Sequence, residues 1–250
     1  MTYCVGLLLQ DGMVLLSDTR TNAGLDNIST YRKMFIFENQ GERVIAIMTA
    51  GSLSITQTTI ARLRDAIDNP EATGDTSILM APTMLKVAEI VGNVLASVRS
   101  TVDEKLSAMN QGATASMIVA GQRKDGAMRM FLIYPEGNFI EATEDTPYFQ
   151  IGESKYGKPI IDRVIRYDTT PLDEAAKCTL VSFDSTIQSN LSVGLPIDMI
   201  MLRANQFEQA MKPPNRIGRD DPYFQALRMG WSAGLRKVFD DLPNEPWFDA

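Results

Sequence analysis

The sequence predicts an α+β protein built as a four-layer αββα sandwich, and the order of its hydrophobic patterns is the main reason. Strand-like runs fill residues 2–49, helical spacing follows over 52–106, strand-like runs return over 115–142, and helical spacing dominates 152–189. A fold of alternating strands and helices would not separate these blocks, whereas a layered α+β fold does. No repeat or linker divides the chain, so we expect one domain over residues 1–250, with a helical, acidic tail from about 221.

The first fifty residues are typical of a meander of four antiparallel strands. Residues 2–9 form an apolar run that ends at a Gln-Asp-Gly turn, and Met13–Ser17 returns to place Asp18 at its end. Lys33 begins a third strand, and a fourth follows the next turn. Because antiparallel strands of similar length begin and end at the same level, we expect Thr2, Asp18 and Lys33 to meet at one end of this sheet.

The remaining elements follow from hydrophobic periodicity and from turn residues. Apolar residues at every third or fourth position predict helices over 52–67, 84–106, 152–166, 172–189 and 222–242. Short apolar runs bounded by glycine, proline and polar turns predict strands over 115–120, 128–134, 139–142 and 197–202. The polar segment 69–75 predicts a surface loop.

Composition excludes several classes of function. The net charge is −7, which argues against a nucleic-acid partner. No apolar run is long enough for a bilayer, and the start lacks the layout of a signal peptide, so we expect a cytoplasmic protein. Cys4 and Cys178 are far apart and there is no histidine, so neither a metal site nor an organic cofactor is expected. No glycine-rich phosphate loop with lysine occurs, so the chain is not itself an ATPase.

The absence of histidine also excludes every catalytic triad that uses imidazole. Removal of Met1 would give Thr2 both a hydroxyl nucleophile and its own base, an α-amino group with a pKa of ~7.7–8. Lys33 would stabilise the developing alkoxide, Asp18 would orient Lys33, and the N–H of Gly51 would bind the oxyanion. Each residue alone has an ordinary structural explanation, such as a turn, a solvated side chain or a helix cap. The combination favours amide hydrolysis.

The spacing of these residues carries a family resemblance. The matching stretches are T-Y-C-V-G at 2–6, D-G-M-V-L-L-S-D-T-R at 11–20, Y-R-K-M-F at 31–35 and M-T-A-G at 48–51. They resemble the β-type subunits of the proteasome and the bacterial HslV peptidase, which are N-terminal-nucleophile hydrolases. The segments 22–34, 50–54 and 151–163 and the long tail look like Anbu, a proteasome-related bacterial family proposed as an ancestral β-subunit.

The resemblance implies the site and the assembly. It assigns the nucleophile to Thr2, its partners to Asp18 and Lys33, and the oxyanion glycine to Gly51. It places the residues lining the substrate pocket near Thr21, Thr49 and Leu53, whose character favours an apolar side chain before the cleaved bond. It further implies a peptide or protein substrate and a ring-like or spiral homo-oligomer.

The chain departs from the family pattern in its supporting residues. The Gly-Ser-Gly turn of proteasome β-subunits reads Gly152-Glu153-Ser154 here, so Ser154 or Glu153 takes the place of its serine. The later supporting pair falls on Asp184 with Ser189. Two alternatives remain open: a peptidase that depends on a partner ATPase, as HslV does, and a catalytically silent scaffold like proteasome α-subunits.

Overall fold

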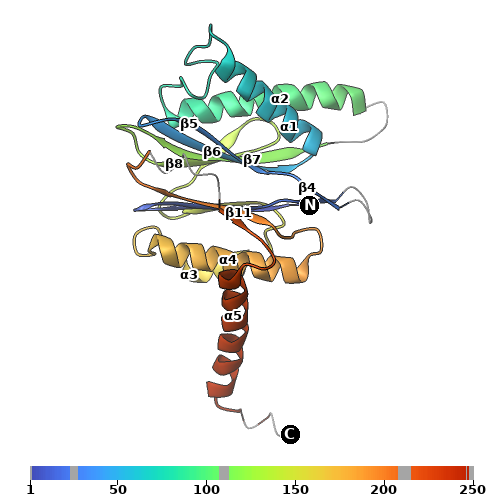
Figure 1. The fold of residues 1–250 in the computed structure, drawn as a ribbon, viewed down its shortest axis with the longest axis vertical. Coiled ribbons are helices and arrows are strands. Elements are labelled where there is room, and N and C mark those ends of the chain that lie inside the picture. The colour runs from blue at the N-terminus through green and yellow to red at the C-terminus, as the bar shows by residue number, and fades with distance from the viewer. Residues whose placement is uncertain (1, 23–27, 107–112, 208–214, 246, 248–250) are drawn as a thin grey trace.

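The computed structural model describes residues 2–22, 28–106, 113–207, 215–245 and 247. Two five-stranded antiparallel sheets lie face to face between two pairs of helices (Figure 1). Helices α1 (Leu53–Asp68) and α2 (Met84–Leu106) cover one sheet, and α3 (Lys158–Val164) and α4 (Leu172–Ser189) cover the other. The predicted αββα sandwich is confirmed. None of the helices within the described residues has the length and apolar character needed to span a membrane.

Each sheet combines strands from distant parts of the chain. The first sheet has the order β10 (Tyr148–Gly152), β1 (Tyr3–Leu9), β2 (Gly12–Asp18), β11 (Ile197–Arg203) and β12 (Asn215–Ile217). The second has the order β5 (Met34–Asn39), β6 (Arg43–Gly51), β7 (Ala115–Arg123), β8 (Arg129–Ile133) and β9 (Phe139–Glu141). A short pair, β3 (Arg20–Asn22) and β4 (Ile28–Thr30), links the two.

The predicted four-stranded meander is therefore wrong. Strands β1 and β2 form a hairpin in the first sheet, whereas β5 and β6 form a hairpin in the second. Hairpins are specified locally by their turns, but the partner of a hairpin's outer edge is chosen by tertiary packing. Here β1 pairs with β10, which comes about 140 residues later in the chain.

Three hydrophobic clusters fill the three interfaces between the layers. Tyr3 and Val5 of β1 pack against α3 and α4, whereas Cys4 and Leu8 pack against the second sheet. A third cluster joins the second sheet to α1 and α2. Both faces of β1 are thus buried, which explains why residues 2–9 read as a continuous apolar run and not as an alternating one. This burial holds the start of β1 inside the sandwich.

The helix predicted over 152–166 is wrong in its first part. Residues Tyr148–Gly152 form strand β10, and α3 begins only at Lys158. Gly152 has φ +83°, a left-handed conformation that stops the strand and turns the chain toward α3. The three-residue strands β3, β4 and β12 are too short for periodicity to reveal.

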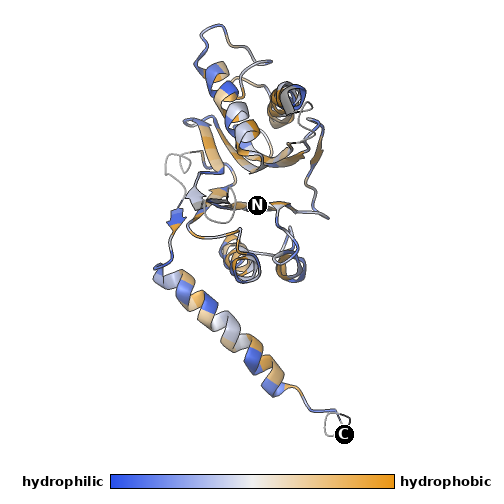
Figure 2. Ribbon diagram, turned by 90° about the vertical axis from the view of Figure 1, so that its right-hand side faces the viewer, coloured by the Kyte–Doolittle hydropathy of each residue, from blue (hydrophilic) through white to orange (hydrophobic). Residues whose placement is uncertain are grey.

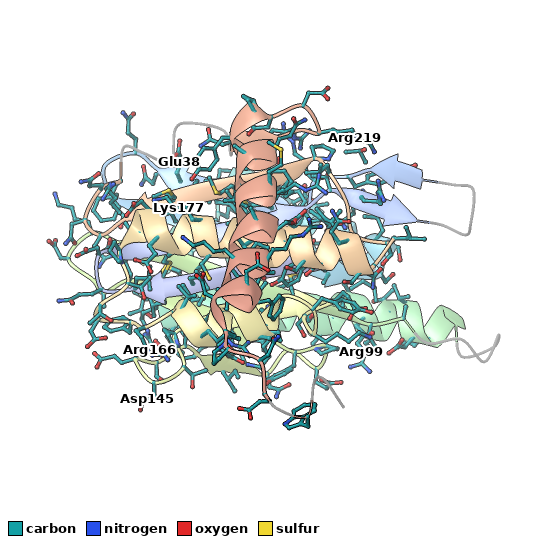
Figure 3. All side chains as sticks on the ribbon, turned by 90° about the horizontal axis from the view of Figure 1, so that it is seen from below. Glu38, Arg99, Asp145, Arg166, Lys177 and Arg219 are labelled. Atoms are coloured by element: carbon teal, nitrogen blue, oxygen red, sulfur yellow. The ribbon has the colours of Figure 1, made fainter. Side chains whose placement is uncertain are left out.

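Helix α5 (Pro222–Asp241) extends away from the layered body (Figures 1 and 2). Asp221 caps it by accepting a hydrogen bond from the N–H of Phe224 at 2.8 Å, and Phe224 is its buried residue. Viewed from the side of the α3–α4 layer, α5 crosses in front of α4 (Figure 3). Most of its surface therefore has no neighbour within the described chain.

Candidate functional site

The start of β1 is fixed by two backbone contacts. The N–H of Glu153 donates to the carbonyl of Thr2 at 2.7 Å, and the N–H of Tyr3 donates to Asp18 Oδ1 at 3.2 Å. A Cβ on Gly152 would lie 1.9 Å from the Thr2 carbonyl oxygen. Only glycine therefore allows the end of β10 to approach Thr2 this closely. Thr2 itself is 7% exposed.

Asp18 and Lys33 form a buried ion pair that bridges the two sheets. Lys33 Nζ lies 2.8 Å from Asp18 Oδ1, and it also donates to the carbonyl of Arg20 at 2.5 Å. The two side chains are 0% and 5% exposed, respectively. Because Asp18 Oδ1 also accepts the Tyr3 amide, one carboxylate oxygen connects the start of β1 to the lysine. The ammonium group is oriented by protein acceptors and not by bulk water.

The environment of Asp18 makes its charge sensitive to pH. Burial raises the pKa of the Asp18 carboxyl to about 6, although Lys33 and the backbone amides of Tyr3 and Gly194 act to lower it. Desolvation thus outweighs the favourable contacts. The carboxylate is ionised at neutral pH and begins to take up a proton near pH 6.

Gly51 lies at the exposed end of β6, directly before α1. Its φ is +104°, and a Cβ there would lie 2.3 Å from the carbonyl oxygen of Thr114. The position therefore requires glycine. The N-terminus of α1 adds partial positive charge next to it, which suits a group that binds a developing oxyanion.

The three residues predicted to line the substrate pocket come from separate elements. Thr21 lies on β3 and Leu53 begins α1, and both are half-buried. Thr49 on β6 is buried, and its N–H and hydroxyl donate to the carbonyl of Lys33 at 2.9 and 3.5 Å. Thr49 therefore fixes the backbone that carries the lysine. The preference of the pocket stays a prediction.

The predicted supporting residues have contacts of different kinds. Ser154 lies in the turn after β10, where its carbonyl accepts the N–H of Lys158 at 2.9 Å. Ser189 is the exposed last residue of α4. Ser182, seven residues earlier, faces β1, because its hydroxyl lies 2.7 Å from the hydroxyl of Tyr3.

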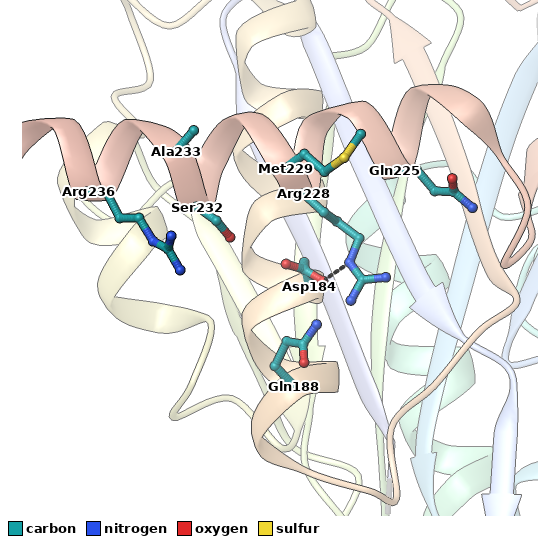
Figure 4. A pocket seen from close by; sticks show the side chains of 8 residues that line it. All are labelled: Asp184, Gln188, Gln225, Arg228, Met229, Ser232, Ala233 and Arg236. Carbon is teal, nitrogen blue, oxygen red and sulfur yellow. Dashed lines mark ion pairs between the residues drawn. The ribbon is translucent and has the colours of Figure 1, made fainter.

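Asp184 belongs to the opposite face of α4. Two residues correspond to roughly 200° of an α-helix, so Asp184 turns away from the face on which Ser182 meets β1. Its carboxylate lies 2.5 Å from Nε of Arg228 on α5 (Figure 4). The ion pair borders a groove of about 540 Å³ between α4 and α5. The contacts of Asp184 thus belong to this groove and not to the start of β1.

Sequence reasoning missed the loop after α4. Asn190 Nδ2 donates to Glu153 Oε2 at 2.9 Å, which connects this loop to the residue that holds Thr2. Arg20 donates to the carbonyl of Leu191 at 3.0 Å, and its guanidinium lies against Gly194. In the sequence, Gly194 reads only as the residue that ends a helix. No group of three or more acidic, cysteine or histidine residues in the described parts of the chain is arranged to hold a metal ion.

Comparisons with known proteins agree on one family. The sequence profile of the proteasome subunit family matches residues 2–200. Anbu (ancestral beta-subunit) from Yersinia bercovieri is 44% identical over 97% of this chain and 99% of its own, with a TM-score of 0.89. An Anbu (Gly-1) mutant from Hyphomicrobium sp. strain MC1 is 43% identical over 98% and 99%, with a TM-score of 0.90.

A further solved structure describes an assembly. It is the helical assembly of the Anbu complex from Pseudomonas aeruginosa, 44% identical over 98% of both chains, with a TM-score of 0.89. A comparison with curated proteins found no match.

Proposed function

Because this chain belongs to the proteasome subunit family and, within it, to the Anbu group, we propose that it is a threonine-type peptidase. The observation that best supports this activity is the buried Asp18–Lys33 pair at the start of the strand that follows Thr2. An ion pair this deeply buried is weak evidence of stabilisation, because desolvation offsets its attraction. A fixed ammonium beside a hydroxyl nucleophile has a clear use in catalysis.

The proposed acylation step uses the processed chain, in which the Met1–Thr2 bond has been cleaved. The Thr2 hydroxyl oxygen attacks the substrate carbonyl carbon while its proton passes to the α-amino group of the same residue. The N–H of Gly51 stabilises the oxyanion, and Lys33 stabilises the developing negative charge on the hydroxyl oxygen. Collapse breaks the carbon–nitrogen bond, and the α-ammonium group returns the proton to the leaving amine.

The proposed deacylation step repeats this proton transfer with water. The α-amino group takes a proton from water as the water oxygen attacks the ester carbonyl. The proton then returns to the Thr2 oxygen as the ester bond breaks, which releases a carboxylic acid and restores the hydroxyl. The reaction consumes one water per bond and uses no cofactor. We assign it to the cytoplasm, where the free thiols of Cys4 and Cys178 stay reduced.

We also propose that the chain assembles with copies of itself through α5. Six apolar residues recur on α5 and just beyond it at every third or fourth position: Phe224, Leu227, Trp231, Leu235, Val238 and Leu242. Phe224 and Leu227 pack against the body, whereas the last four are 37–58% exposed. A helix that presents such a stripe needs a partner, because most helical stability in proteins comes from the packing of an amphipathic face. The helical assembly of the relative from P. aeruginosa supports a second copy as that partner.

Labelling by a threonine-directed electrophile tests the proposed nucleophile. The intact mass of the purified protein, measured before and after treatment with a peptide epoxyketone, should show loss of Met1 and one adduct. The Thr2→Ala variant should form no adduct, whereas Thr101→Ala, which removes an exposed threonine on α2, should react as the wild type does. Retention of Met1 without an adduct would contradict the peptidase and favour a silent scaffold.

A further inference from the structure

Glu153 directly follows β10, and its backbone contacts that of the proposed nucleophile. The register pairs Tyr3 with Gly152, and the N–H of Glu153 donates to the carbonyl of Thr2 at 2.7 Å. This hydrogen bond places the Glu153 backbone in direct contact with that of Thr2. A carboxylate on this residue can act electrostatically on the α-amino group that Thr2 gains once Met1 is removed.

This carboxylate is fixed by the loop after α4. Its Oε2 accepts a hydrogen bond from Asn190 Nδ2 at 2.9 Å, and the Glu153 side chain is only 12% exposed. Asn190 is fixed in turn, because its Oδ1 accepts the N–H and the hydroxyl of Ser192 at 2.9 and 2.5 Å. Lys155 Nζ lies 3.5 Å from Oε1, but this lysine is 67% exposed, so solvent screens its charge.

The other charges near Thr2 have partners of their own. Lys33 is paired with Asp18, and the guanidinium of Arg20 donates to the carbonyl of Leu191. Glu153 thus carries a largely shielded carboxylate next to Thr2, and the described cationic partner of that carboxylate is a solvent-screened lysine. A positively charged group beside this carboxylate would give it a closer ion-pair partner.

We propose that Glu153 is a positioning residue that anchors the α-ammonium group of Thr2. The proposal rests on the proposed function, since it concerns the processed N-terminus. The nearby anion stabilises the protonated amine, so a smaller fraction of the chain carries a free base at neutral pH. Hydrolysis should therefore be slow near neutrality and increase in alkaline solution.

The reactivity of the α-amino group tests this anchor without any substrate. The protein is produced with Thr2 as its first residue, and its rate of acetylation by acetic anhydride is followed against pH by mass spectrometry of the N-terminal peptide. The midpoint of this profile should fall by about one pH unit in Glu153→Gln. Glu141→Gln, which removes a partly exposed carboxylate on β9, should leave it unchanged. Equal midpoints for the wild type and Glu153→Gln would overturn the proposal.

A second variant provides the test if Glu153→Gln fails to fold, which circular dichroism would detect. Asn190→Ala keeps the Glu153 charge but releases the carboxylate from its donor, so the midpoint should fall by a smaller amount. If Glu153→Gln does not fold, an unchanged midpoint in Asn190→Ala overturns the anchor. Hydrolysis of peptides is measured separately. A shifted midpoint without any hydrolysis supports the anchor and contradicts the proposed peptidase, so the two failures are distinguishable.

Discussion

At the scale of single residues, the Asp18–Lys33 pair defines the site. Lys33 has acceptors from two elements, the Asp18 carboxylate and the Arg20 carbonyl, and both side chains are shielded from water. Removing one partner would leave an uncompensated buried charge, which typically costs about 3–5 kcal/mol of unfolding free energy. A single substitution at Asp18 or Lys33 would therefore change both the unfolding free energy and the activity. The pH dependence of the unchanged chain tests the role of the pair without this complication.

Two protonation events should lower the activity as the pH falls, one at the α-amino group and one at Asp18. The α-amino group must be neutral, so log kcat/KM should fall with a slope of one as the pH drops below the pKa of that group. Asp18 must be ionised to orient Lys33, so the slope should increase to two below about pH 6. Measurements of kcat/KM from pH 4.5 to 9 check this, and a slope of one throughout would contradict the role of Asp18.

The contribution of Asp18 to the unfolding free energy should depend on pH in the opposite direction: it should increase as the pH falls. The pKa of Asp18 is about 6 in the folded chain against an ordinary 3.8, so the folded state binds this proton more tightly. The stabilisation from this group is complete below about pH 4 and is lost as the pH rises through 6. The double variant Asp18→Asn/Lys33→Met serves as the control, because its unfolding free energy in urea should lack this contribution.

At the scale of elements, the meeting of β10 with β1 sets the position of Thr2. Gly152 combines φ +83° with a carbonyl oxygen 1.9 Å from any added Cβ, so a side chain there must displace the Thr2 backbone. Gly41 has a similar φ of +74°, but a Cβ there would meet nothing within 4 Å. A substitution at Gly41 therefore measures the cost of the left-handed conformation alone, whereas one at Gly152 adds the cost of the close contact with Thr2.

Alanine at these two glycines should have different effects. Gly41→Ala should cost about 1–2 kcal/mol of unfolding free energy and leave kcat/KM unchanged, because only the backbone conformation is strained. Gly152→Ala should cost more and should lower kcat/KM at least tenfold, since it moves the nucleophile. Urea unfolding and peptide hydrolysis measure both quantities. Equal losses of activity in the two variants would show that Gly152 does not position Thr2.

These elements also show what the sequence could predict. The hairpin formed by β1 and β2 and the helix pairs were predictable because turns and hydrophobic period are local signals. The pairing of β1 with β10 was not, because it depends on residues about 140 positions apart. Asp18 and Lys33 were predicted to meet, and they do, but across two sheets and not within one. Asn190 carries no local signal that links it to Glu153.

At the scale of the whole molecule, α5 is the part least explained by a single chain. Its first turns are anchored by Phe224 and Leu227, and the rest extends past α4 with its apolar stripe uncovered (Figure 2). The groove between α4 and α5 carries Arg228 and Arg236, whereas Asp240 and Asp241 end the helix.

Charges placed on the apolar stripe should break the assembly without unfolding the subunit. The variant Leu235→Asp/Val238→Asp alters two residues that are 41% and 56% exposed. It should sediment as smaller species than the wild type in analytical ultracentrifugation. Gly230→Asp/Lys237→Asp, at exposed positions off the stripe, should sediment as the wild type does. If both variants match the wild type, α5 is not the assembly element.

The division of the two N-terminal hairpins between different sheets has a consequence for protein synthesis. Asp18 and Lys33 are synthesised early, but the sheet that carries Asp18 is completed only when β11 (Ile197–Arg203) and β12 (Asn215–Ile217) have been synthesised. A nascent chain therefore holds a threonine without an organised lysine. Under the proposed function, the site is complete only in the finished sandwich, so an unfinished chain should be inactive toward the polypeptides around it.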